Sequence, residues 1–238
     1  MQNRYTASAE IYDKIYAEVV DYLVTGRLLK WLITDRNPDA RTVLEVACGT
    51  GEVLRHLADD FEVAGLDISD EMLEVARAKL PGVEFRRLDM ADFEWGSTFD
   101  VVLCMFSSIG YMTDLRGLHA AYERMVAHLN PGGVLVCEGW LQPAAFQKDF
   151  VGGLAVGDHT FRVHRVNNSW LEEDGRVSVM DMHHLVGKPE GVTHFVERHR
   201  MGLFTVEEHL AAIRETGIEA EHRPDLFMGR GTYVGVKP

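Results

Sequence analysis

The sequence predicts an α/β fold in which an open, doubly wound sheet carries an antiparallel, β-rich insertion. Two observations predict it. Short apolar runs alternate with helical periodicities over the first two thirds of the chain, and strand-like alternation takes over after about residue 145. Regular alternation of strands and helices favours parallel pairing with right-handed crossovers, and therefore a single sheet with helices on both faces.

The elements of the first part are identified in chain order. Apolar residues recur at helical spacing over 10–34, which predicts a helical N-terminal segment. Apolar runs then alternate with amphipathic segments, and Pro-Gly or Asn-Pro-Gly-Gly turns end two of the helices. We expect strands over 42–48, 62–69, 83–90, 99–107 and 134–140, and helices over 52–60, 71–80 and 115–129.

The later part predicts antiparallel strands over 160–171, 176–186 and 193–204, with turns at 172–175 and 187–191. A helix over 205–217 begins at Thr205, with Glu208 three residues on as in a capping box, and Gly217 follows its end. Two last strands of the main sheet follow, over 218–224 and 231–237. We expect one domain over 1–238, divided into a helical lid (1–35), a ligand-binding core (40–145), the insertion (150–203) and closing elements (204–238).

Composition narrows the class of protein. The 238 residues are 46% hydrophobic and 26% charged, as in ordinary globular proteins, and the net charge is −13. An acidic chain is a poor partner for nucleic acid or an anionic membrane. Cys48, Cys104 and Cys137 lie in apolar runs without metal-ligand spacing, which predicts reduced, buried thiols. With no signal-peptide or membrane-span pattern, we expect a cytoplasmic protein.

The stretch VLEVACGTGEV (43–53) predicts a strand, a glycine turn and a helix, a usual place for a bound nucleotide. A P-loop needs a lysine that is absent, and a dinucleotide fingerprint needs a third glycine that is also absent. The acidic Glu45 would repel a pyrophosphate but can accept a hydrogen bond from a cation, such as the amino group of a methionyl moiety. Gly49 and Gly51 allow close approach of the backbone to a ligand.

Two further acidic positions follow the next strands. Asp67 ends the second strand, about twenty residues after the loop, where a carboxylate can bind both ribose hydroxyls. Asp89 and Met90 follow the third strand, where they can meet an adenine amino group and stack on its ring. The ordered set, more than the short glycine motif, predicts a nucleoside that carries a positively charged amino acid.

These residues resemble the signature of the class I S-adenosylmethionine-dependent methyltransferases, whose sheet is Rossmann-like. The resemblance covers at least residues 40–140, including the NPGGVL that precedes the fifth strand. It implies S-adenosylmethionine as cofactor and S-adenosylhomocysteine as its product. The implied cofactor contacts are Glu45, Ala47, Gly49, Gly51, Asp67, Ile68, Met72, Asp89, Met90 and Met105.

Over nearly the full chain, segments such as CMFSSIGY (104–111), EGW (138–140) and MGRGTYVGV (228–236) resemble the sugar N,N-dimethyltransferases of antibiotic biosynthesis. Those enzymes methylate the 3-amino group of a dTDP-linked deoxyhexose. The resemblance implies catalytic positions at Tyr12 and Tyr111, which also belong to the implied substrate contacts. The implied substrate-side set is Tyr12, Tyr111, Glu138, Trp140, Arg165 and Arg230.

The sequence departs from that family at two segments. Tyr111 stands where relatives carry a histidine, and AEVV (17–20) stands where they carry a basic stretch. In addition, EGWL replaces EPWW. Methyl transfer needs a neutral amine, which burial favours, and a nearby hydroxyl or imidazole can take the proton. A strong base is therefore not required, and the missing histidine is compatible with activity.

Alternatives stay open at this point. The acceptor can be another small amine or a hydroxyl, and a non-catalytic protein that binds S-adenosylmethionine is a further alternative. His183, His184, His194 and His199 cluster in sequence, but strand alternation places His183 and His184 on opposite faces, so we expect no metal site. The sequence leaves the assembly state open, with a homodimer as one alternative.

Overall fold

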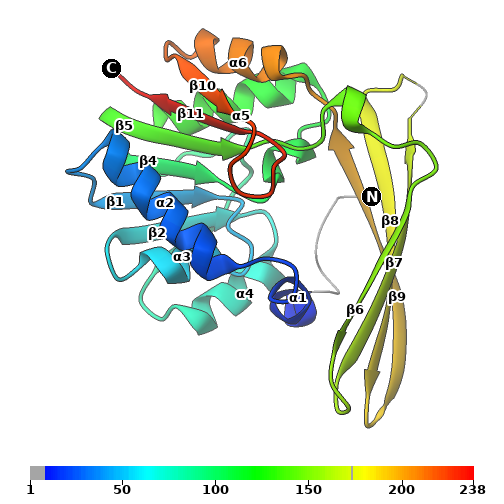
Figure 1. Ribbon diagram of the computed structural model, residues 1–238. Helices are drawn as coiled ribbons and strands as arrows, with labels where there is room; N and C mark the ends of the chain where they lie inside the picture. The colour runs from blue at the N-terminus through cyan, green and yellow to red at the C-terminus, as the bar shows by residue number, and fades with distance from the viewer. Residues whose placement is uncertain (1–8, 173) are drawn as a thin grey trace.

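The computed structural model describes residues 9–172 and 174–238, and its centre is a seven-stranded sheet (Figure 1). Residues 1–8 of the expected lid lie outside the described residues. The strand order is β10-β11-β5-β4-β1-β2-β3, and every pair is parallel except the two that involve β11. The strands are β1 (Thr42–Val46), β2 (Glu62–Asp67), β3 (Glu84–Arg87), β4 (Phe99–Cys104), β5 (Leu129–Glu138), β10 (Ala220–Arg223) and β11 (Thr232–Val236).

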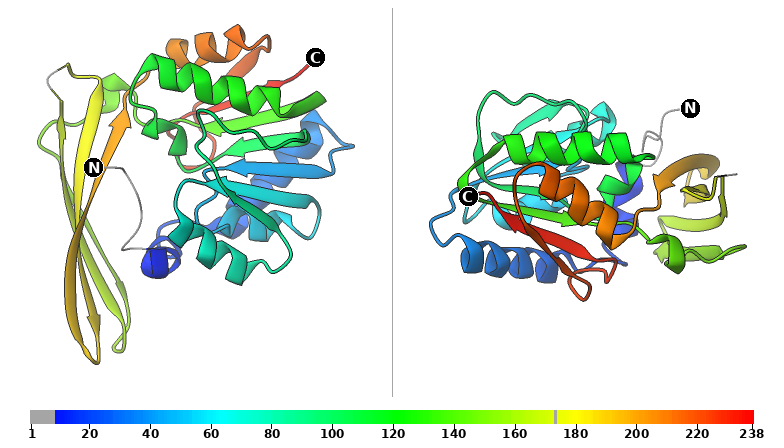
Figure 2. Two further views of the ribbon diagram at one scale, coloured as in Figure 1. Left: turned by 180° about the vertical axis from the view of Figure 1, so that it is seen from behind. Right: turned by 90° about the horizontal axis from the view of Figure 1, so that it is seen from above.

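Helices cover both faces of this sheet, as the predicted doubly wound fold requires. Seen from above, α2 lies on one side of the strands and α5 and α6 lie on the other (Figure 2). The helices are α1 (Ala9–Tyr16), α2 (Tyr22–Arg36), α3 (Glu52–Leu57), α4 (Asp70–Lys79), α5 (Leu115–Ala127) and α6 (Val206–Glu215), with short 3₁₀ turns η1 (Ser108–Tyr111) and η2 (Pro143–Ala145). None of these described helices has the length and apolar character that crossing a membrane requires.

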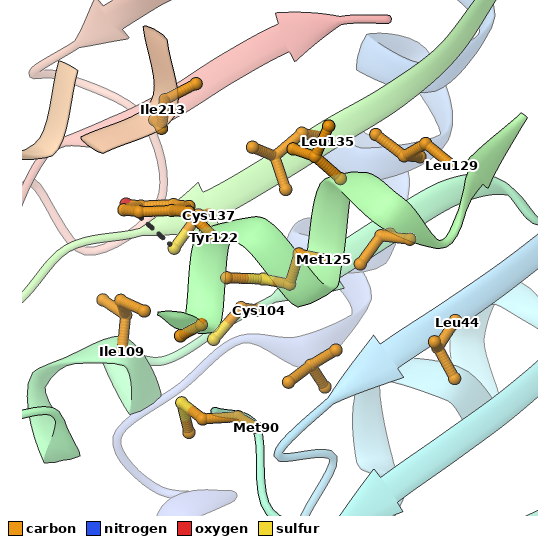
Figure 3. Packing of buried hydrophobic residues seen from close by; sticks show 14 of the residues in the cluster. Leu44, Met90, Cys104, Ile109, Tyr122, Met125, Leu129, Leu135, Cys137 and Ile213 are labelled. Atoms are coloured by element: carbon orange, nitrogen blue, oxygen red, sulfur yellow. Dashed lines mark hydrogen bonds between the residues drawn. The ribbon is translucent and has the colours of Figure 1, made fainter. Parts of the chain in front are cut away.

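Strand alternation divides the core into two clusters. Along β4, Val101 and Leu103 pack with the helices of one face, whereas Val102 and Cys104 pack with those of the other. On the second face Tyr122 of α5 reaches across to β5, and its hydroxyl donates to the Cys137 Sγ at 3.6 Å (Figure 3). Cys48, Cys104 and Cys137 are all free and buried, as predicted.

The N-terminal helical segment is two helices, not one continuous run. Asp21 ends the break between α1 and α2, because its side chain accepts a hydrogen bond from the Val24 backbone N–H and caps α2. Helix α2 packs on the main sheet, whereas α1 packs on the second sheet through Ile11 and Ile15.

The second sheet is antiparallel, with the order β6-β7-β8-β9. Its strands are β6 (Val151–Gly157), β7 (Arg162–Leu171), β8 (Val177–Lys188) and β9 (Gly191–Gly202). Figure 1 shows it standing beside the main sheet, with α1 between the two. Strand β6 was not predicted, because VGGLAVG has three glycines in seven residues and lacks the β-branched and aromatic pattern of its neighbours.

The ends of two strands differ from prediction for local reasons, whereas the start of α6 agrees with it. Strand β4 ends at Cys104 and not at 107, because Phe106 and Ser107 take left-handed φ angles of 53° and 64°. Strand β5 begins at Leu129, before the NPGG turn, and a register shift against β4 absorbs the extra residues. Helix α6 has the predicted capping box of Thr205 and Glu208.

Candidate functional site

A cavity of about 270 Å³ lies where the parallel strands of the main sheet end, between α1 and η1. Such ends are where ligands bind on open α/β sheets. The cavity is lined by Tyr12, Ala47, Gly49, Leu66, Asp67, Ile68, Ser69, Met72, Leu88, Asp89, Met90, Ser108, Tyr111 and Met112. We call it the donor cavity, after the methyl donor whose contacts the resemblance places among these residues.

The turn after β1 forms one wall of the donor cavity. Ala47, Gly49 and Gly51 have φ angles of 57°, 54° and 72°, in the left-handed region that favours glycine. Open space surrounds the position that a Cβ on Gly49 would take, so the backbone itself faces the cavity. Gly51 begins α3 and does not line the cavity.

Asp67 joins this turn to the end of β2. Its Oδ2 accepts from the Gly49 backbone N–H at 2.9 Å, and its Oδ1 accepts from the Ser69 N–H at 2.9 Å. Burial raises the pKa of Asp67, and the backbone donors partly oppose that rise. A carboxylate thus lies in the cavity wall with its orientation fixed and lone pairs left for a ligand.

The remaining predicted cofactor positions divide between the wall and the core. Ile68, Met72, Asp89 and Met90 line the donor cavity. Met105 does not line it; only 1% of its surface is exposed, and it packs in the core cluster that contains α2.

Glu45 lies beneath the turn and not in the cavity wall. It is 2% exposed, and its Oε2 has no hydrogen-bond partner among the described residues. Burial first, and then the charge of Asp67, raise the pKa of Glu45 well above its ordinary value. The ionised form is therefore disfavoured in the protein without ligand.

Replacing Glu45 with glutamine is expected to raise the melting temperature of the ligand-free protein more at pH 8 than at pH 5. A carboxyl whose pKa is raised by folding contributes its full stability only below its unfolded pKa of about 4.3. That contribution is lost as pH rises through the folded-state pKa. The exposed Glu84→Gln on β3 is the matched control. A melting difference that does not change with pH contradicts the expectation.

Helix α1 is fastened over the donor cavity by a small polar network. Asp13 accepts from the Thr50 hydroxyl at 2.5 Å and pairs with Lys79 at 2.6 Å, and Lys79 also pairs with Glu52 at 2.6 Å. These contacts tie α1 to the glycine turn and to α4. They hold Tyr12 in the cavity wall, where burial is the main cause that raises the pKa of its hydroxyl.

A second cavity, of about 280 Å³, lies between the end of β5 and the inner face of the second sheet. It is lined by Trp140, Leu141, Ala145, Phe146, Gln147, Phe150, Ser169, Ser178, Met180, His199 and Met201. The Trp140 indole N–H donates to the Ser178 Oγ at 3.2 Å, which fixes the ring in this wall. We call it the acceptor cavity, after the methyl acceptor, because Trp140 belongs to the substrate-side set that the resemblance implies.

One hydrogen bond joins the walls of the two cavities. The Tyr111 hydroxyl, in the donor cavity, lies 2.9 Å from the His199 Nδ1, in the acceptor cavity. The sequence singled out Tyr111 but not His199. Alternation places His184 and His199 on the inner face, both buried, and leaves His183 exposed. This alternation along the strands was the signal in the sequence that could have identified His199.

Arg230 and Glu138, which were predicted on the substrate side, both contact the turn at Phe106 and Ser107 that follows β4. The Arg230 guanidinium donates to the Ser107 Oγ at 3.1 Å and lies 4.5 Å from the Trp140 ring centroid. Glu138 is fully buried and lines neither cavity; it accepts from the Phe106 N–H at 2.8 Å. Burial raises the pKa of Glu138.

Arg165 lies on the inner face of the second sheet, opposite His184 on β8. Its guanidinium donates to the Tyr16 hydroxyl at 3.2 Å, and the Tyr16 ring packs on Tyr12 with centroids 4.3 Å apart. Arg165 is in neither cavity wall but supports the side of α1 that faces the donor cavity. The described residues contain no group of three or more His, Cys, Asp or Glu that could hold a metal ion.

Comparisons with known proteins agree with this geometry. A family model for a methyltransferase domain matches residues 43–133. A dTDP-3-amino-3,6-dideoxy-α-D-glucopyranose N,N-dimethyltransferase of Streptomyces fradiae is 39% identical, covering 96% of this chain and 90% of its own. A dTDP-4-amino-2,3,4,6-tetradeoxy-D-glucose N,N-dimethyltransferase of Saccharopolyspora spinosa is 36% identical, covering 100% and 98%.

Two solved methyltransferase structures are also similar to this chain. DesVI of Streptomyces venezuelae superimposes with a TM-score of 0.92 at 37% identity, over 97% of this chain and 98% of its own. CalS10, an amino pentose methyltransferase of Micromonospora echinaspora with S-adenosylmethionine bound, gives 0.87 at 34% identity over 100% of both. The chain is thus an S-adenosylmethionine-dependent methyltransferase, and it belongs to the class I family that includes the dTDP-amino-sugar N,N-dimethyltransferases.

Proposed function

We propose that this enzyme methylates the amino group of a dTDP-linked amino-deoxyhexose, with the 3-amino sugar as the first candidate. One observation carries the proposal: the hydrogen bond between Tyr111 and His199 joins the wall of the donor cavity to the wall of a second, largely apolar cavity. In this proposal the sugar enters the second cavity and presents its amino group at Tyr111. Relatives named for dTDP-3-amino and dTDP-4-amino sugars support this choice.

The residues of the donor cavity suit S-adenosylmethionine in a definite direction. Along the sheet edge the order is β3, β2, β1, β4, so Asp89, Asp67, Gly49 and Tyr111 follow one another across the cavity. In our proposal Asp89 receives the adenine amino group, Asp67 the ribose hydroxyls and the turn at Gly49 the methionyl part. When bound, the cofactor supplies a methyl group on a sulfonium. In this arrangement Tyr111 would lie at the end of the row where the methyl group is presented.

The protein has to present a neutral amine to that methyl group. The donor-cavity wall contains Leu66, Met72, Leu88 and Met112, and an apolar setting disfavours the ammonium form. Correct alignment of two reactants in such a pocket can by itself supply roughly 7–11 kcal/mol of the barrier. Tyr12 and Tyr111 add hydroxyl oxygens that can hold an N–H of the acceptor.

The nucleotide part of the acceptor would lie beyond Tyr111. Arg230 offers a charge-assisted contact for a diphosphate next to the broad face of Trp140. Glu138 acts indirectly, because it fixes the turn that carries Ser107 and its bond to Arg230.

Calorimetry with dTDP and turnover of matched sugars test the proposal. We expect dTDP to bind, and the dTDP-3-amino-3,6-dideoxy sugar to be mono- and then dimethylated, faster than its 4-amino isomer and its 3-hydroxy counterpart. A protein that neither binds dTDP nor methylates either amino sugar contradicts the proposal. The second candidate, another small amine or hydroxyl, is favoured by the apolar wall of the acceptor cavity, and preferred turnover of such a compound would support it.

A further inference from the structure

The hydrogen bond between Tyr111 and His199 links two elements that are far apart in sequence. Tyr111 ends η1, directly after the strand at the centre of the main sheet, and His199 lies on β9 of the second sheet. The rings are tilted at 52° with centroids 6.1 Å apart, so the two side chains meet through their polar atoms and do not stack. His199 is 1% exposed. A contact this enclosed holds the Tyr111 hydroxyl in one orientation.

The surroundings keep the His199 imidazole neutral. Burial first, then His184 and Arg165, lower the pKa of His199 to about 4, and Asp181 opposes the shift. Glu197 shares the inner face of β9 two residues away. With a pKa of about 4, roughly one imidazole in a thousand is protonated at pH 7. His199 is therefore a poor proton acceptor for an alkylammonium group but a good hydrogen-bond acceptor.

The direction of this hydrogen bond matters for the chemistry. A neutral imidazole has one N–H and one acceptor nitrogen. If Nδ1 donated to Tyr111, the phenol proton would be free to point at the amine and occupy the lone pair that must attack the methyl carbon. If Nδ1 accepts, the phenol proton is committed to His199, and the Tyr111 oxygen offers only lone pairs to the ligand.

We propose that His199 is a positioning residue for Tyr111: its Nδ1 accepts the phenol O–H, so that Tyr111 Oη accepts an N–H of the amine. This inference rests on the proposed amine substrate. The amine lone pair becomes the new N–C bond, the electron pair of the broken C–S bond stays on sulfur, and the nitrogen becomes positive. An oxygen lone pair facing the N–H stabilises that developing charge. The proton later leaves to solvent.

Each transfer in a dimethylation has an N–H available for Tyr111. The primary amine offers two and the monomethylated amine offers one, whereas the neutral dimethylated product offers none. The arrangement therefore supports two transfers and withdraws its contact from the final product.

A double-mutant cycle tests the pair. At saturating S-adenosylmethionine, His199→Leu is expected to lower kcat about 10-fold, the usual effect of one lost hydrogen bond. In the Tyr111→Phe background the same change should have almost no effect, and His199→Asn, which keeps an acceptor near the Nδ1 position, should recover most of the rate. His194→Leu, on the same strand, is the control. Equal losses in both backgrounds, or no recovery with asparagine, overturn the proposal.

Two further measurements separate this inference from the proposed function. The melting shift with S-adenosylmethionine, taken for each variant, checks that the donor cavity still folds. Nitrogen-15 NMR of the wild-type histidines should find His199 Nδ1 unprotonated, with a shift that moves in Tyr111→Phe. A protonated Nδ1 overturns the pair whatever the substrate is. If Nδ1 is unprotonated and its shift depends on Tyr111, but the protein does not methylate amino sugars, only the proposed function is overturned.

Discussion

Replacing Asp67 with alanine is expected to weaken S-adenosylmethionine binding by about 100-fold or more. The change removes the carboxylate proposed to hold the ribose hydroxyls, and hydrogen bonds to a charged group contribute about 1.5–3 kcal/mol each. It also releases the Gly49 and Ser69 backbone donors that Asp67 now satisfies, so the glycine turn loses its fixed orientation. Titration calorimetry with S-adenosylmethionine and S-adenosylhomocysteine measures the loss.

The control for this experiment is Asp60→Ala, a surface carboxylate paired only with Lys30 among the described residues. It should leave the affinity unchanged. Circular dichroism checks that the Asp67 variant is folded, and the raised pKa of Asp67 indicates that its charge is not itself a source of stability. An unchanged dissociation constant in folded Asp67→Ala would remove this residue from the cofactor site.

Replacing Arg230 with methionine is expected to raise the KM for the dTDP-amino sugar about 10- to 100-fold and to leave the affinity for S-adenosylmethionine unchanged. Methionine keeps an apolar stem against Trp140, so the change isolates the lost charge and the lost bond to Ser107. A charge-assisted contact to a phosphate of about 1.5–3 kcal/mol corresponds to that range. Steady-state kinetics with each substrate varied in turn measure the split.

Arg214→Met, on the exposed end of α6, is the matched control and should leave both constants unchanged. Arg230→Lys should lie between wild type and methionine, because lysine keeps the charge but lacks the planar fork. Should Arg230→Met instead lower kcat with an unchanged KM, the residue acts on the transfer step and not on nucleotide binding.

Much of the main sheet was predictable because its signals are local. Apolar runs between helical periodicities predicted β1 to β5, and the capping pair Thr205 and Glu208 predicted the start of α6. The order of the motifs also predicted that Gly49, Asp67 and Asp89 lie together in the wall of the donor cavity, since each lies at or just after the end of a different parallel strand. Parallel topology brings such strand ends together without further information.

What the sequence did not predict depends on long-range pairing. Strand β6 exists because β7 supplies its partners, and glycine-rich residues carry no strand signal of their own. Glu138 and Met105 are enclosed by neighbours from distant elements. Their motifs indicated that they lie near the site, but could not indicate that they are buried behind its wall. The role of His199 follows only from a second sheet that stands against η1.

The turn at Phe106 and Ser107 has one further consequence, for evolution and for engineering. Left-handed backbone at a non-glycine residue costs about 1–2 kcal/mol, and here two such residues are adjacent. Ser107→Gly would relieve part of that strain, yet it would remove the hydroxyl oxygen that accepts the hydrogen bond from the Arg230 guanidinium. Selection for heat resistance would favour glycine here, whereas selection for turnover would favour serine. A substitution of Ser107 that raises thermal stability is thus expected to lower the turnover of the enzyme.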